Sequence, residues 1–403
     1  MTKLSLGILG ILVSAGSALG PCSKGDDTSK PAASASAAST TPAAPASASA
    51  ASSASASAAG SAGAAPSASA SAAPKKTFEE ELAASKPLDI KTAEQTLGAD
   101  KITAEVCAVE GGPFTNKSNM DVLKSIRAVG DRVFAVDADG KVHAYKIDAG
   151  PKCKLSVDKT FGESGVVKLE NKIDRLSTDS AGNLWATNGV FASYKLDKNG
   201  KQTAKCEGRP LGYLFVHPSG KTGIGTFANA TTAKVTLDGA GCKTEPWAFQ
   251  DLSDDAKRKG PLANAQAVGF VGDTIFLGGV LSKKEDPGGN TVVLAVDAAG
   301  KEKLRMGRID KEYSQKDRFG WVHAITPCKQ GVCVLDSNYR RLTAWKVADG
   351  KFVGDVDLQK LFGLKYPWVA DLDRNKTHTY FVAGQDRDGS HVGEGNIYRV
   401  TGL

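Results

Sequence analysis

The sequence has few of the residues and motifs that carry enzyme chemistry. Its 403 residues include five histidines, three methionines and 7% aromatic residues. It has no Gly-x-Ser-x-Gly elbow, His-Glu-x-x-His helix, phosphate-binding loop or dinucleotide fingerprint. The histidines are scattered along the chain, which favours structural or solvent-exposed roles: they are His143, His217, His323, His378 and His391.

The excess of positive over negative charge is also small. The formal net charge is +7, and the lysines are dispersed and do not form a basic stripe interleaved with aromatic residues. Nucleic-acid binding is therefore not expected. Attraction to anionic polymers of a cell envelope is compatible with this charge.

The one strongly apolar run lies at the start of the chain. Leu4–Val13 follows Lys3 and is about ten residues long, too short for the roughly 20 residues of a membrane span. Residues 1–21 therefore read as a signal peptide. No later run is apolar enough to span a bilayer, so we expect the rest of the chain to be exported.

The residues around Cys22 resemble the lipobox of bacterial lipoproteins, in which a leucine and two small residues precede a lipidated cysteine. Here they are Leu19, Gly20 and Pro21, and the proline departs from the family pattern. The resemblance implies that Cys22 receives the lipid and becomes the mature N-terminus. The alternative is ordinary secretion into the periplasm or medium, with cleavage after Ala18.

Cysteine parity favours lipidation of Cys22. An exported chain meets oxidising conditions, and consuming Cys22 leaves an even six of the seven cysteines. Ser23, with no acidic residue directly after Cys22, fits sorting to the outer membrane. We therefore predict a lipoprotein of the bacterial cell envelope, anchored in the outer membrane.

Residues 22–75 form the predicted anchor region and linker. From Pro31 to Pro74 the chain is almost wholly Ala, Ser, Pro, Thr and Gly, with nothing to bury in a core. We expect a disordered tether with an end-to-end distance of roughly 35 Å. Residues 76–100 predict two short helices, because Thr77 with Glu80 and Thr92 with Gln95 have capping-box spacing.

Residues 101–403 consist of repeated short strands and turns. Equivalent second strands recur at intervals of roughly 40 to 60 residues, close to the length of a four-stranded propeller blade. Their predicted starts are Val133, Leu184, Thr222, Thr274, Val332 and Thr379. The fold class predicted is all-β, a six-bladed β-propeller. Its last unit lacks an outer strand, which we expect Lys101–Gly111 to supply and so close the ring.

The propeller region resembles the NHL-type and streptogramin-lyase-like six-bladed propellers. The motif most similar to theirs is "DRLSTDSAGNLWATN", Asp174–Asn188. The segments "DADGKVHAYKID" and "DAAGKEKL" are less similar to the same motif. The resemblance implies a fold but no particular activity, because this fold carries enzymes, scaffolds and recognition modules alike.

The remaining six cysteines are expected to form disulfides. Cys328 and Cys333 flank a hairpin turn at a separation suited to a cross-strand bridge. Three connectivities are compatible with the other four cysteines, and sequence order favours Cys107–Cys153 and Cys206–Cys242.

The expected functional surface is the end of the ring where second strands finish and inner strands begin. Two long loops, 281–290 and 385–396, are predicted to overhang it. Polar and aromatic residues recur there and predict an axial pocket for a polar ligand; the candidates are Asp137, Asn188, Tyr213, Asn229, Trp321, Asn338, Tyr339, Tyr366, Trp368 and Gln385. Turn geometry and blade packing explain any one of them as well.

The function predicted is noncatalytic recognition of an envelope protein or polysaccharide. One alternative is a periplasmic or surface lyase or hydrolase with axial carboxylates or a divalent metal, for which Asp137, Asp336 and Asp386 are the weak candidate ligands. Another is a structural scaffold. No cofactor is predicted, and a divalent metal remains compatible with the sequence.

Overall fold

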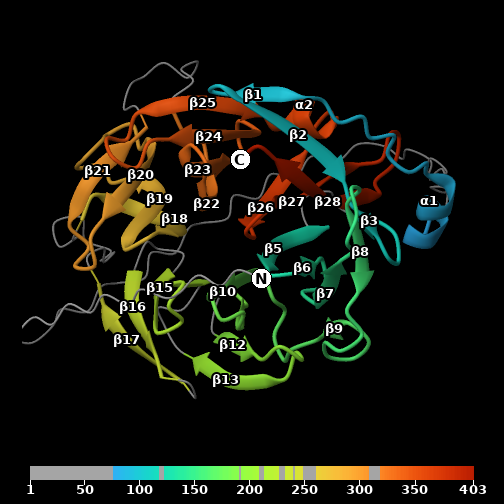
Figure 1. The fold of residues 1–403 in the computed structure, drawn as a ribbon, viewed down its shortest axis with the longest axis horizontal. Helices are drawn as coiled ribbons and strands as arrows, with labels where there is room; N and C mark the ends of the chain where they lie inside the picture. Colours follow the sequence, from blue (N-terminus) through green and yellow to red (C-terminus); the bar gives the residue numbers. More distant parts are fainter. Residues whose placement is uncertain are drawn as a thin grey trace, which may run out of the picture. The chain divides into compact units, whose positions relative to one another are not determined.

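The computed structural model describes residues 76–117, 122–189, 192–207, 213–226, 232–238, 241–247, 260–307 and 318–403. Six sheets, in which successive strands pair antiparallel, follow one another along this part of the chain and surround a common axis (Figure 1). They are the six blades of a β-propeller, so the predicted fold class is confirmed. The signal peptide, Cys22, the linker and Asn229 lie outside the described residues.

The blades share one order of strands, from the axis outwards (Figure 1). The inner strands are β5 (Leu123–Val129), β10 (Arg175–Thr178), β14 (Tyr213–Val216), β18 (Leu262–Val271), β22 (Val322–Cys328) and β26 (Trp368–Arg374). The second strands are β6 (Arg132–Asp137), β11 (Leu184–Thr187), β15 (Thr222–Thr226), β19 (Thr274–Leu281), β23 (Gly331–Asp336) and β27 (Thr379–Asp386).

The outer half of each blade completes the sheet. The third strands are β7 (Val142–Ile147), β12 (Ala192–Leu196), β16 (Thr232–Leu237), β20 (Thr291–Val296), β24 (Arg341–Trp345) and β28 (Gly393–Thr401). The outer strands of the first five blades are β8 (Lys154–Val157), β13 (Gln202–Glu207), β17 (Cys242–Pro246), β21 (Glu302–Met306) and β25 (Phe352–Asp357). Short additions are β1 (Gln95–Leu97), β3 (Ala108–Val109), β4 (Phe114–Asn116) and β9 (Val166–Val167).

The last blade takes its outer strand from the N-terminal side of the domain. Strand β2 (Asp100–Val106) pairs antiparallel with β28, and Thr103 lies opposite Thr401. The chain then continues through β3, which pairs in parallel with β8 of the first blade. Pairing of β2 leaves β28 without a free edge, which is the physical reason for this closure.

Hydrophobic clusters fill the spaces between neighbouring blades. Strand β6 illustrates the pattern, because its alternate side chains face opposite neighbours. Val133 and Ala135 pack towards the last blade, whereas Phe134 and Val136 pack towards the second. Both faces of such a strand are buried, which explains why the second strands read as nearly continuous apolar runs.

One of the two predicted N-terminal helices is present. Helix α1 (Phe78–Ala84) begins at the capping box formed by Thr77 and Glu80. The second prediction is wrong, because Gln95–Leu97 is strand β1. The Gln95 amide bonds the backbone N–H and C=O of Asp357, an edge-strand contact in place of a helix cap.

The six cysteines of the domain form three disulfides, Cys107–Cys153, Cys206–Cys242 and Cys328–Cys333. The first joins the segment after β2 to the first blade, and the second joins the outer strands of two adjacent blades. In the hairpin of β22 and β23 the third is diagonal, because Cys333 lies opposite Thr326. Neither α1 nor α2 (Leu358–Phe362), the helices of the described ranges, has the length and apolar character of a membrane span.

Candidate functional site

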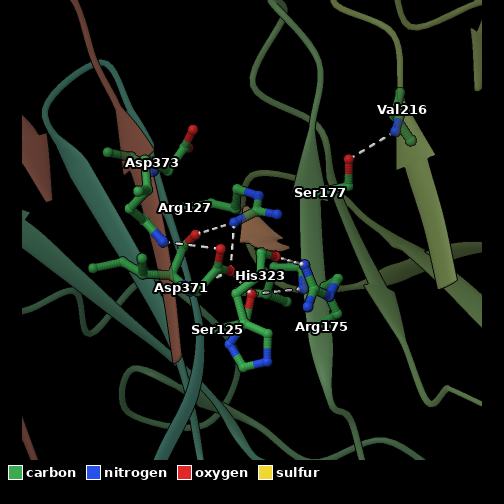
Figure 2. Close-up of polar contacts among 12 residues, drawn as sticks. Ser125, Arg127, Arg175, Ser177, Val216, His323, Asp371 and Asp373 are labelled. Carbon is green, nitrogen blue, oxygen red and sulfur yellow. Dashed lines mark hydrogen bonds and ion pairs between the residues drawn. The ribbon is translucent and has the colours of Figure 1, made fainter. Parts of the chain in front are cut away.

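Polar side chains on the inner strands link neighbouring blades at the axis. Ser125 on β5 accepts a hydrogen bond from the Leu176 amide of the next inner strand, at 3.0 Å. Ser177 accepts one from Val216 at 2.8 Å (Figure 2), and Gln266 accepts one from Val322 at 3.1 Å. These bonds satisfy buried inner-strand N–H groups that lack a ladder partner on that side.

Asp371 on β26 makes the same link between the last and first blades, and it also carries an ion pair. Its carboxylate is fully buried and lies 2.7 Å from Arg127 Nη1. Ser125 Oγ donates to it at 2.5 Å and the Ile126 amide at 3.2 Å (Figure 2). Burial alone would lower the pKa of Arg127, but the carboxylates of Asp371 and Asp373 raise it above its ordinary value. Arg127 is therefore charged at all physiological pH values.

Two further axial groups have displaced pKa values. Burial raises the pKa of Asp373 to about 6, although Arg127 opposes the shift and the Ala128 amide donates to this carboxylate at 2.9 Å. Burial and the nearby Arg175 charge lower the pKa of His323 to about 4. His323 is therefore neutral at pH 7, and Asp373 titrates close to physiological pH.

Arg175 crosses the axis. Its Nη1 donates to the His323 carbonyl at 3.0 Å (Figure 2), and this bond joins inner strands of the second and fifth blades. The guanidinium also lies over the rings of Tyr213 and Phe215, 5.2 and 5.4 Å from their centroids. The charged groups at the axis are thus bonded mainly to one another and to the backbone.

A group of exposed aromatic residues lies at the end of the ring where second strands finish and inner strands begin, which is the end predicted to carry the functional surface. Trp321, Tyr339 and Tyr366 are the large hydrophobic residues exposed in the described chain, at 39%, 38% and 69%. Trp321 precedes β22, Tyr339 lies between β23 and β24, and Tyr366 precedes β26. We call these three residues, together with Arg340, the aromatic surface.

Asp336 fixes two members of the aromatic surface. Its fully buried carboxylate accepts hydrogen bonds from the amides of Gly320 at 3.0 Å, Trp321 at 3.1 Å and Tyr339 at 3.4 Å. One side chain therefore holds the segment before β22 against the turn after β23. The guanidinium of Arg341 lies over the Tyr339 ring, 4.9 Å from its centroid.

Gln385 fixes the third member in the same way. Its side-chain oxygen accepts hydrogen bonds from the amides of Lys365 at 2.8 Å and Tyr366 at 3.2 Å. The guanidinium of Arg340 lies over the Tyr366 ring, 5.7 Å from its centroid. Arg340 of the fifth blade thus contacts Tyr366 of the sixth.

The other ligand-binding candidates predicted from the sequence lie outside the aromatic surface, and some of them stabilise turns or pack at the axis. Asn338 is exposed beside Tyr339, and the Trp368 ring meets His323 edge-on at 5.2 Å. The buried Asn188 side chain accepts the Ala192 amide at 3.0 Å, and Tyr213 packs under Arg175. Most predicted polar residues therefore hold turns, which was the simpler interpretation of the sequence.

The three weak metal candidates do not converge. Asp137 lies in the first blade and bonds His143 Nε2 at 2.7 Å, Asp336 is occupied by backbone amides, and Asp386 is exposed in the sixth blade. In the described ranges, no group of three or more His, Cys, Asp or Glu side chains is placed to hold a metal ion.

One of the two predicted overhanging loops, 385–396, is shorter than expected. Half of residues 385–396 belong to β27 and β28, and Arg387–Val392 connects the two strands. Residues 282–290 do form a turn, in which the Asp286 carboxylate accepts the amides of Gly288 and Asn290 at 3.0 and 2.7 Å.

Sequence reasoning missed the axial cluster. The sequence feature that could have revealed this cluster is a polar residue within an apolar inner strand, such as Ser125 in "LKSIRAV" and Ser177 in "RLST". Such residues point towards neighbouring blades at the axis, where an alanine or valine would leave an amide unpaired.

The known structures that are similar to this chain share little sequence with it. No family model matches the chain, and no curated protein matches it. A chain of the nidogen/laminin complex has 11% identity and a TM-score of 0.41, covering 60% of this chain and 82% of its own.

Two other solved structures are similar at the same level. The Cps50 (Swd1) β-propeller domain of Myceliophteria thermophila has 14% identity and a TM-score of 0.42, covering 72% of this chain and 100% of its own. A catalytically inactive virginiamycin B lyase of Staphylococcus aureus, solved with quinupristin, has 11% identity and a TM-score of 0.43, covering 75% and 100%. Similarity at this level says nothing about activity.

Proposed function

We propose that the chain is a noncatalytic recognition propeller, tethered to the cell envelope, which binds an exported protein through the aromatic surface. The observation that carries the proposal is the grouping of Trp321, Tyr339 and Tyr366 with Arg340 at one end of adjacent blades. Tryptophan, tyrosine and arginine dominate the energetic centres of protein interfaces. Exposed rings of this size lose unfavourable contact with water when a partner covers them.

Rigidity of the surface supports the proposal. The backbone of Trp321 and Tyr339 is held by the Asp336 carboxylate, and that of Tyr366 by Gln385. Residues that are already ordered lose little conformational entropy on binding, so more of the contact energy appears as affinity.

The alternative functions have less support. A lyase or hydrolase requires a carboxylate or metal free to act on substrate, whereas Asp371 is paired with Arg127 and bonded to Ser125. A scaffold without a ligand leaves the exposed rings unexplained. A polysaccharide partner is compatible with the same rings, and the experiment below distinguishes it from a protein.

Site-specific photo-crosslinking tests the proposal. A benzophenone amino acid placed at Tyr366 in the exported protein is expected to capture a protein. The matched control is the same group at Asp273, which is exposed in the turn after β18 at the other end of the ring. Capture of a glycan alone supports the polysaccharide alternative. No adduct from Tyr366, together with a stoichiometric bound metal, supports the enzyme and contradicts the proposal.

We propose that Cys22 carries the lipid that tethers the domain. Its support is the signal-peptide core, the lipobox-like residues and the even number of remaining cysteines, which pair in three disulfides. Mass spectrometry of the mature N-terminus is expected to find a diacylglyceryl thioether on Cys22. An unmodified peptide beginning at Leu19 contradicts the anchor and leaves the proposed recognition surface untouched.

A further inference from the structure

A cavity of about 460 Å³ lies on the axis at the end opposite the aromatic surface. All six blades contribute to its lining, at the places where inner strands turn into second strands. Its volume lies within the usual range for small-molecule sites. The aromatic surface and this cavity share no residue.

The wall of the cavity is largely apolar. Phe215, Val268, Phe270, Ile325 and Leu372 line it, each from a different inner strand or its end, except for the pair from β18. Such a wall favours a ligand with an apolar body, because burial of that body removes apolar area from water on both sides.

The charged groups of the cavity are mostly occupied. Asp179 accepts the amides of Ala181 at 3.0 Å and Asn183 at 2.9 Å within its own turn, and Arg127 is paired with Asp371. The carboxylate of Asp373 lies beside Arg127 and accepts the Ala128 amide. Arg374 and Lys376 add positive charge to the lining.

No carboxylate pairs with Arg175 in the described chain, and it differs from Arg374 and Lys376, which also lack an ion pair there, because its guanidinium is held in place at the axis. Its single hydrogen bond uses Nη1 and the His323 carbonyl, and its plane is packed on Tyr213 and Phe215. Nε and Nη2, which form the fork that binds carboxylates in a bidentate manner, bond no described residue. A half-buried guanidinium without a counter-charge is costly, and an anion in the cavity removes that cost.

We propose that the axial cavity binds a small amphipathic carboxylate. The ligand's carboxylate accepts two hydrogen bonds from Nε and Nη2 of Arg175, and its apolar body lies against Phe215 and Phe270. Arg127 is excluded as the main anchor because Asp371 already neutralises it. The site is independent of the macromolecular partner proposed above.

Benzoate serves as the probe, with benzyl alcohol as its neutral isostere, in calorimetric titrations of the full chain at pH 7. Benzoate is expected to bind at one site and benzyl alcohol at least about tenfold more weakly. Arg175→Gln keeps a donor for the His323 carbonyl but removes the charged fork, and it is expected to weaken benzoate binding about tenfold or more. Lys159→Gln changes the net charge equally at an exposed position in the first blade and is expected to leave the affinity unchanged.

A crystal structure with 4-bromobenzoate provides a measurement that needs no variant. The anomalous bromine peak is expected in the axial cavity, with the carboxylate on Arg175. Equal binding of benzoate and benzyl alcohol, unchanged affinity in a folded Arg175→Gln variant, or bromine peaks only elsewhere overturns the proposal. If Arg175→Gln does not fold, the position of the bromine decides.

Discussion

Arg175 on β10 and His323 on β22 are joined across the propeller axis by a hydrogen bond of 3.0 Å between guanidinium Nη1 and the backbone carbonyl. These strands belong to the second and fifth blades, which face each other in the ring (Figure 1). Packing between neighbours holds adjacent blades together, whereas this bond connects opposite ones. The buried charges at the axis therefore bear on the stability of the whole ring.

The pKa values of Asp373 and His323 predict opposite effects of pH on stability. The pKa of Asp373 rises from 3.8 unfolded to about 6 folded, so its contribution is present below pH 3.8 and is lost as the pH rises to 6. The pKa of His323 falls from 6.5 to about 4, so its contribution is present above pH 6.5 and is lost as the pH falls to 4. Each effect amounts to at most about 3 kcal/mol.

Urea unfolding between pH 4 and 6.5 separates the two contributions. Asp373→Asn is expected to make the free energy of unfolding rise more steeply with pH than in the wild type. His323→Gln, which keeps the backbone carbonyl that Arg175 bonds, is expected to make it rise less steeply or fall. Parallel pH profiles for the two variants would show that these groups do not have the assigned pKa values.

Asp336 is expected to be a supporting residue for the aromatic surface. Asp336→Asn removes a buried carboxylate that accepts the Gly320 and Trp321 amides, so the free energy of unfolding is expected to fall by about 2 to 4 kcal/mol. The emission of Trp321 is expected to change as well. The control Asp386→Asn alters an exposed carboxylate in the next blade and is expected to cost less than about 0.5 kcal/mol. Equal effects of the two variants contradict this role.

The disulfides are expected to differ in their contribution to stability. Cys107–Cys153 closes a loop with a sequence separation of 46 residues, and Cys328–Cys333 one of 5. Loop-closure entropy predicts losses of about 4 and about 2 kcal/mol when each pair is replaced by serines. Chemical denaturation of the two double variants measures the difference. A larger loss for Cys328–Cys333 is the opposite of the expected order.

Much of the fold was predictable from local patterns. The predicted second-strand starts at Leu184, Thr222, Thr274 and Thr379 coincide with β11, β15, β19 and β27, because turns and alternating apolar runs mark them. The second helix was not predictable in this way. Gln95 has the spacing of a capping residue, but a tertiary contact with Asp357 decides its structure.

The candidate site was predictable only in part. The sequence placed Trp321, Tyr339 and Tyr366 at one end of the ring, and they are exposed there. It treated Asp336 as a weak metal ligand, because its use as an acceptor for the Gly320 and Trp321 amides depends on backbone positions. The contact between Arg175 and His323 joins residues 148 positions apart, which no local pattern indicates.

The most direct test of the recognition proposal is the affinity for the protein captured from Tyr366. Calorimetry with that purified protein is expected to show that Tyr366→Ala raises the dissociation constant at least about tenfold. Asp273→Ala, at the other end of the ring, is expected to leave it unchanged. A dissociation constant that Tyr366→Ala does not alter would contradict recognition through the aromatic surface.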